Sequence, residues 1–250
     1  MTSISFSARD INDAASTNTQ CAVVPIFNGS KLIPAASQLD KATGGAIKSA
    51  LELGDFSGKA GQSLMLPGAG GAKRLLLIGC GDAKKFDRSA AREFSQRVYI
   101  ALNGTSAKDA ILHIGDLQLK DGDSVWLLNY LARHLVAASY RYTETVSKPK
   151  RPLKLRRVVV NISGKANIRI ANAALKQGCS IGLGVNQACN LANLPGNICT
   201  PSYLAQQARK LGRGNSKLSV SVLEEKKMKS WVWIHYCRFP PAVSSPPNSL

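Results

Sequence analysis

The chain has 250 residues, of which 44% are hydrophobic and 19% are charged, as in an ordinary globular protein. Its 33 Lys and Arg residues face 15 Asp and Glu residues, which gives a formal net charge of +18. Such a charge attracts polyanions, or it forms a solvated basic surface without a partner. No segment reaches the ~20 apolar residues of a membrane span, and the N-terminal residues lack the apolar core of a secretory signal, so we expect no membrane partner.

The six cysteines show no Cys-x-x-Cys pair and no Cys/His spacing typical of a metal site. In a chain of this size, scattered cysteines predict free thiols in a reducing cytoplasm. Cys21 and Cys80 lie in apolar runs and are interpreted as small buried hydrophobic residues. The histidines (His113, His134 and His235) share no ligand spacing, and we assign them no catalytic or metal role.

Apolar runs with strand character alternate with helical patterns through the first 160 residues, which predicts an α/β domain. The expected strands span 21–27, 62–66, 73–78, 109–114 and 157–162, and the expected helices span 38–53, 89–102 and 124–139.

A second region begins with a long helix expected over about 165–192, which joins two domains. Pro195, Gly196 and Pro201 indicate a loop, after which Thr200 caps a helix that has Pro201 in its first turn. Residues 218–223 alternate as a strand, and another helix begins at residue 224.

The last twenty residues, 231–250, differ sharply in composition from the rest: they are rich in Trp and Pro and contain no acidic residue. Reading their codons one base out of phase forces Gly from Trp231-Val232, Asp from Trp233-Ile234, and two Leu from His235-Tyr236-Cys237. The whole tail back-translates to LGMDSLLSVSPGSEQPPKLI, which continues the preceding helix. We therefore interpret the tail as a frameshift product near residue 230, a hypothesis that sequencing the gene tests.

Residues 191–229 contain Asn193-Leu194-Pro195-Gly196-Asn197-Ile198-Cys199-Thr200-Pro201, then Tyr203-Leu204-Ala205, and end with Glu225-Lys226-Lys227-Met228-Lys229. With the recovered LGMDSLLSV, this segment resembles the opening of the catalytic domain of the cytosol (leucyl) aminopeptidases. Looser matches lie upstream, at Gln38-Leu39-Asp40, Gly58-Lys59-Ala60-Gly61-Gln62, Leu75 to Gly81 and Arg151-Pro152-Leu153. Cys189 and Asn190 depart from the family pattern of a basic residue followed by Asp.

The resemblance implies a division into an N-terminal α/β domain over 1–160, a linker helix over 165–192, an incomplete start of the catalytic domain over 193–230, and the aberrant tail. It also implies the fold class of the first domain, a mixed β-sheet flanked by helices that is similar to a macro domain. The family's activity is removal of N-terminal residues, preferably leucine, from peptides by two divalent metals, manganese or zinc, within a hexamer.

The metal ligands of the family lie in the second half of the catalytic domain, and its signature Asn-Thr-Asp-Ala-Glu-Gly-Arg occurs nowhere in this sequence. We therefore assign no catalytic residue, no metal ligand and no cofactor to this chain. We expect a non-catalytic fragment that folds through its first domain and exposes apolar surface on the helices that follow.

The alternative function is that of a basic binding or oligomer-assembly module. Six cations fall within ten residues, where Pro149 and Pro152 favour an extended backbone that can follow a phosphate chain. Some bacterial members of the family also bind DNA, which makes nucleic acid a candidate partner of this stretch; the other interpretation is a solvated linker. No aromatic residue interleaves with these cations, which disfavours single-strand recognition. The candidate residues are Lys148, Lys150, Arg151, Lys154, Arg156 and Arg157.

Overall fold

The computed structural model describes residues 4–148, 153–213 and 215–230. These fall into two compact units. The first combines the residues up to Arg141 with those from Lys148 to Asn186, and the second combines Tyr142–Ser147 with those from Gln187 onward. The proposed frameshifted tail, 231–250, lies outside the described residues.

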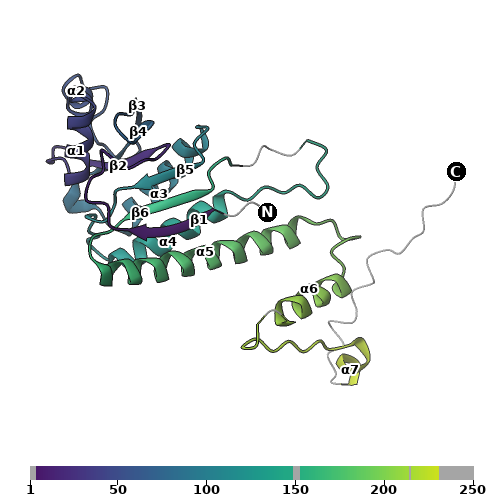
Figure 1. The fold of residues 1–250 in the computed structure, drawn as a ribbon. Helices are drawn as coiled ribbons and strands as arrows, with labels where there is room; N and C mark the ends of the chain where they lie inside the picture. The colour runs from purple at the N-terminus through teal and green to yellow at the C-terminus, as the bar shows by residue number, and fades with distance from the viewer. Residues whose placement is uncertain (1–3, 149–152, 214, 231–250) are drawn as a thin grey trace. The chain divides into compact units, whose positions relative to one another are not determined.

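The first unit is built on a six-stranded mixed sheet in the order β1-β6-β5-β2-β4-β3 (Figure 1). All neighbouring strands are parallel except β3, which pairs antiparallel to β4 at one edge. The expected mixed α/β fold is thus confirmed. The strands are β1 (Ser5–Arg9), β2 (Ala22–Phe27), β3 (Ser63–Pro67), β4 (Arg74–Gly81), β5 (Asp109–Leu112) and β6 (Arg157–Asn161).

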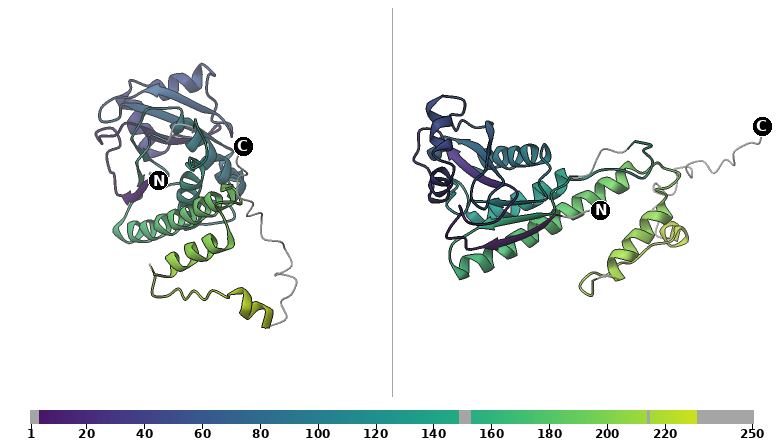
Figure 2. Two further views of the ribbon diagram at one scale, coloured as in Figure 1. Left: turned by 90° about the vertical axis from the view of Figure 1, so that its right-hand side faces the viewer. Right: turned by 45° about the horizontal axis from the view of Figure 1, so that its top comes forward.

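One face of the sheet is covered along its length by α3 (Arg88–Asn103), α4 (Ser124–Ala138) and α5 (Lys165–Asn193). Their apolar faces pack on alternate strand residues, among them Val23, Leu76 and Val158. Helix α5 lies where a long helix was expected, at about 165–192, and Figure 2 shows this helix lying along the sheet beside β1. Asn172 of α5 fixes that contact because its Oδ1 accepts a hydrogen bond from the Ala8 amide at 2.9 Å.

The other face is covered by helices over part of its width. Here α1 (Pro34–Ala42) and α2 (Ala46–Glu52) contribute Leu39 and Ile47 to a second core, which includes Val24 and Leu77 from the strands. This core involves β2, β4 and β3. No residue of β5, β6 or β1 belongs to it, so their outer face is left to the loop that follows β1.

Two strand predictions differ from the structure. The edge strand β1 was not predicted. Its sequence SFSAR alternates polar and apolar residues, but the pattern is short and only Ala8 is buried. The strand predicted over 218–223 is wrong: these residues form no strand and pair with no other described segment. A strand needs a neighbouring strand for its backbone hydrogen bonds, which an alternating sequence cannot supply by itself.

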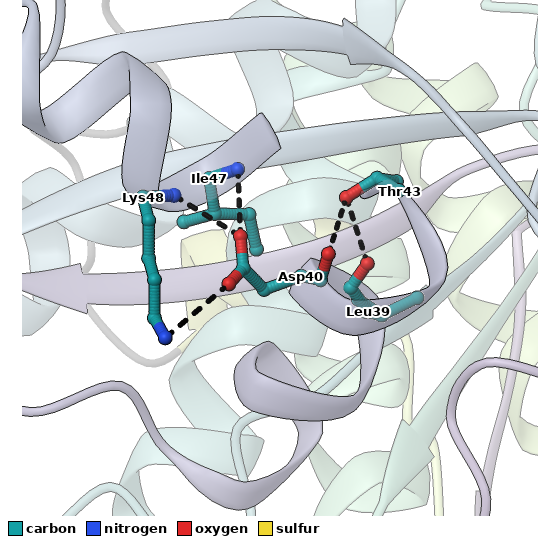
Figure 3. Close-up of polar contacts among 5 residues, drawn as sticks. All are labelled: Leu39, Asp40, Thr43, Ile47 and Lys48. Carbon is teal, nitrogen blue, oxygen red and sulfur yellow. Dashed lines mark hydrogen bonds and ion pairs between the residues drawn. The ribbon is translucent and has the colours of Figure 1, made fainter. Parts of the chain in front are cut away.

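The helix predicted over 38–53 is also wrong, because the chain turns a corner between α1 and α2. Gly44 and Gly45 have φ of +68° and +89°, which end the first helix. The buried carboxylate of Asp40 then caps the second, since its Oδ1 accepts from the amides of Ile47 at 2.9 Å and Lys48 at 3.1 Å (Figure 3). The Lys48 ammonium lies 3.9 Å from the other carboxylate oxygen.

Helices α4 and α5 approach closely at two glycines. A Cβ at Gly178 would lie 2.1 Å from the Asn129 carbonyl oxygen, and one at Gly182 would lie 2.8 Å from Val136. Asn186 completes the contact by donating from Nδ2 to the Val136 carbonyl at 3.1 Å. The small residues of α5 therefore set the spacing of this pair.

The second unit contains α6 (Pro201–Arg213) and α7 (Glu225–Ser230). The predicted cap is confirmed, because Thr200 Oγ1 accepts from the Tyr203 amide at 3.3 Å. No residue of α6 is buried, and Leu204 and Leu211 are 45% and 58% exposed. Among the described residues of this unit, Leu194 alone is buried, so the unit has little core of its own.

Asp40→Ala is expected to lower the free energy of unfolding by about 1–3 kcal/mol, because two helix amides would lose their buried acceptor. Asp40→Asn keeps an acceptor oxygen and is expected to cost less. Urea denaturation followed by circular dichroism measures both. Asp55→Ala, at an exposed aspartate that follows α2, serves as the control, and an equal loss in that variant would contradict the capping role.

Candidate functional site

The six cations predicted as a nucleic-acid site are described in part. Lys148 is exposed, and Lys150 and Arg151 lie outside the described residues. Lys154 and Arg156 precede β6, and Arg157 is its first residue; all three are exposed.

The segment before β6 is held against the main core by alternate leucines. Leu153 and Leu155 are buried there, so the cations between them project from an anchored backbone. The Arg156 guanidinium donates from Nη1 to the Leu153 carbonyl at 2.6 Å and to the Leu155 carbonyl at 3.4 Å. Lys154 and Arg157 keep exposed charges that no ion pair neutralises within the described part of the chain.

A second basic surface, which sequence reasoning missed, lies on α3 and α4. Rings four residues apart stack along α4, with centroid distances of 5.2 and 5.9 Å. Arginine guanidiniums lie over two of these rings at 5.2–6.0 Å, an arrangement that favours a cation–π attraction. The spacing of the rings was the available signal, but the arginines come partly from another helix. The rings are Trp126, Tyr130 and His134, and the cations are Arg88, Arg92 and Arg133.

His113 is buried at the end of β5 and is 2% exposed. Its Nδ1 lies 3.2 Å from Nδ2 of Asn161, whose amide also bonds the backbone of Ile11 through both its oxygen and its nitrogen. Burial lowers the pKa of His113 to about 4, so the ring is neutral at physiological pH. His113 therefore has a structural environment rather than that of an acid–base catalyst.

The two predicted buried thiols are confirmed as core residues. Cys21 is fully buried in β2, and Cys80 is buried in β4. Burial raises the pKa of Cys21 to about 12, and it also raises the pKa of Cys80. Both sulfurs therefore stay protonated and unreactive.

Within the described residues, no group of three or more His, Cys, Asp or Glu side chains is placed to hold a metal ion. The residues present thus do not fit a two-metal centre, and no catalytic step is assigned to them. In the same part of the chain, no helix is both long and apolar enough to cross a membrane.

Comparison with known proteins matches this chain to one protein family. The profile of the cytosol aminopeptidase family, N-terminal domain, matches residues 23–149. The chain belongs to the cytosol aminopeptidase family. It is 37% identical over 219 residues to a probable cytosol aminopeptidase of Alkalilimnicola ehrlichii, covering 86% of this chain and 44% of that protein.

A probable cytosol aminopeptidase of Thioalkalivibrio sulfidiphilus is 36% identical over 214 residues, covering 84% of this chain and 43% of that protein. A mutant of tomato leucine aminopeptidase has the same fold, with a TM-score of 0.70 at 24% identity, over 91% of this chain and 46% of that one. The chain therefore spans less than half the length of the curated relatives it matches.

His113 generates a pH prediction. The unfolded chain binds a proton at the ordinary pKa of 6.5, whereas the native ring resists protonation until about pH 4. The contribution of this residue to the free energy of unfolding is therefore fully present above pH 6.5. It is lost as the pH falls towards 4, by up to about 3 kcal/mol.

His113→Gln is expected to flatten the decline in unfolding free energy between pH 6.5 and 4 relative to the unmodified chain. Urea denaturation at a series of pH values measures the two slopes. Parallel slopes would show that His113 does not contribute this proton linkage.

Proposed function

We propose that this chain supplies the N-terminal domain of a cytoplasmic leucyl aminopeptidase, and that the 250 residues by themselves do not hydrolyse peptides. The match of residues 23–149 to the family's N-terminal domain is the observation that carries this proposal. The proposed activity of the whole protein is removal of N-terminal residues from peptides by two manganese or zinc ions. The family's metal-binding signature is absent from the sequence, which supports the inactivity of these residues alone.

The first unit suits the role of a rigid supporting domain. Each strand of its sheet is hydrogen-bonded to a neighbour, and three helices contribute residues to its main core. Its proposed task is to build and shield a homohexamer, as in the family. Helix α5 serves in this proposal as the connection, and residues 193–230 as the opening of the catalytic domain.

The exposed leucines of α6 fit that proposal. Leu204 and Leu211 belong to a helix with no buried residue, whereas an amphipathic helix normally buries its apolar face. We propose that further catalytic-domain sequence covers them in an intact protein, and that residues 231–250 are a frameshift product. An uninterrupted reading frame encoding residues 231–250, found in independently sequenced DNA, would contradict the frameshift.

The purified chain is expected to release no p-nitroaniline from leucine p-nitroanilide, with manganese or with zinc. The physical reason is that the described residues contain no group of carboxylates placed to hold two metals. A full-length member of the family, assayed in parallel, is the positive control. Metal-dependent hydrolysis that copurifies with this chain would overturn the proposed inactivity.

Nucleic-acid binding is the second candidate function, and exposed unpaired cations favour it. Lys154 and Arg157 lie on the predicted basic stretch, and the arginines over Trp126 and Tyr130 add a separate basic surface with aromatic rings. Because duplex DNA is read through its phosphates in a sequence-independent complex, affinity should fall steeply with salt.

A gel shift with duplex DNA is expected to show a complex at 50 mM salt that weakens by about 10³-fold or more at 200 mM. The double variant Lys148→Gln/Lys154→Gln is expected to bind less well and with a smaller salt dependence. Lys31→Gln/Lys41→Gln removes the same charge from exposed sites elsewhere. Absent binding at low salt, or equal weakening in both double variants, would refute a site on the basic stretch.

A further inference from the structure

A pocket of about 350 Å³ lies on the part of the sheet that no helix covers. Its floor includes Ile111 of β5 and Val159 of β6, which are paired in register. Its wall is the loop after β1, from Asp10 to Asn18. The volume falls at the lower end of the range for small-molecule sites, about 300–1,000 Å³.

The first half of the pocket wall is fixed by side-chain amides. Asn161 accepts from the Ile11 amide at 2.9 Å and donates to the Ile11 carbonyl at 3.1 Å. Gln38 of α1 accepts from the Ala14 amide and donates to the Asn12 carbonyl, each at 2.9 Å. The loop is therefore preorganised, which reduces the entropy lost when a ligand binds.

Opposite charges lie side by side at one end of the floor. Asp109 of β5 and Arg157 of β6 are register partners, on strands about 4.8 Å apart, and both line the pocket. They form no ion pair within the described residues. The Asp109 carboxylate instead bonds the chain before β2, because its Oδ2 accepts from Thr19 Oγ1 at 2.8 Å and from the Gln20 amide at 3.3 Å.

The other charged atoms of Asp109 and Arg157 have no protein partner among the described residues. The Arg157 guanidinium and the second oxygen of Asp109 take part in no hydrogen bond or ion pair in the described part of the chain. One cation and one anion on register partners of neighbouring strands match a ligand whose two opposite charges are attached to the same carbon atom. The aliphatic pair of Ile111 and Val159, two residues further along both strands, offers an adjacent apolar surface.

We propose that this pocket binds a free α-amino acid with an aliphatic side chain. The ligand carboxylate contacts Arg157, its ammonium contacts Asp109, and its side chain lies over Ile111 and Val159. The lining includes two arginines and three aspartates, so a purely anionic ligand would meet more negative than positive charge. A zwitterion carries no net charge, and each of its two charged groups can face a side chain of opposite charge. The inference goes beyond the proposed peptidase function and does not depend on it.

Isothermal titration of the 250-residue chain with four ligands tests the proposal. Leucine carries all three recognised features, whereas 4-methylpentanoate lacks the ammonium, leucinamide lacks the carboxylate and glycine lacks the side chain. Leucine is expected to bind at least about tenfold more tightly than each of the others, as for the loss of one good contact. Equal binding of 4-methylpentanoate would assign the site to anions and overturn the proposal, as would no leucine binding at millimolar concentrations.

Arg157→Gln is expected to weaken leucine binding about tenfold or more, and Asp109→Asn to weaken it while leaving an acceptor for Thr19. Arg169→Gln, at an exposed arginine of α5 outside the pocket, makes the same charge change as a matched control. Unchanged affinity in Arg157→Gln, or equal losses in Arg157→Gln and Arg169→Gln, would overturn the assignment. Because binding is measured without catalysis, its failure is distinguishable from failure of the peptidase proposal.

Discussion

A mostly parallel sheet must be covered on both faces, and in this protein the helices satisfy that requirement unevenly. Helices α3, α4 and α5 contribute to the core on one face, whereas α1 and α2 contribute to the other over β2, β4 and β3. The remaining part of the second face is approached by the loop after β1, which lies near β5 and β6 and lines an open pocket. The position of that pocket is thus a consequence of too few helices on the second face.

Much of the fold could be predicted where buried elements have a clear apolar pattern in the sequence. Strands β2, β4 and β6 are buried along most of their length and appear as continuous apolar runs, and the helices α3 and α4 carry an apolar stripe. Strand β1 was missed because its apolar alternation is limited to Phe6 and Ala8, and its pairing with β6 is not visible in the sequence. The corner at Gly44 and Gly45 was hidden by an apolar pattern that continues through both short helices.

The sequence indicated the family clearly, but it did not indicate which residues meet at the candidate pocket. The family was recognisable from the run Asn193 to Pro201, and the comparisons confirm the family. The candidate cations were chosen because they are adjacent in sequence, yet the structure uses Arg156 on backbone carbonyls and places Arg157 in a pocket. Asp109 is 48 residues before Arg157, and no local pattern indicates that the two meet across neighbouring strands.

The attachment of the pocket wall through Asn161 and Gln38 has a chemical consequence. Amide side chains have no proton to gain or lose in the ordinary range of pH, so these four hydrogen bonds do not depend on acidity. The neighbouring ring of His113 is also neutral until about pH 4. Mild acidification would therefore leave the shape of the pocket wall unchanged.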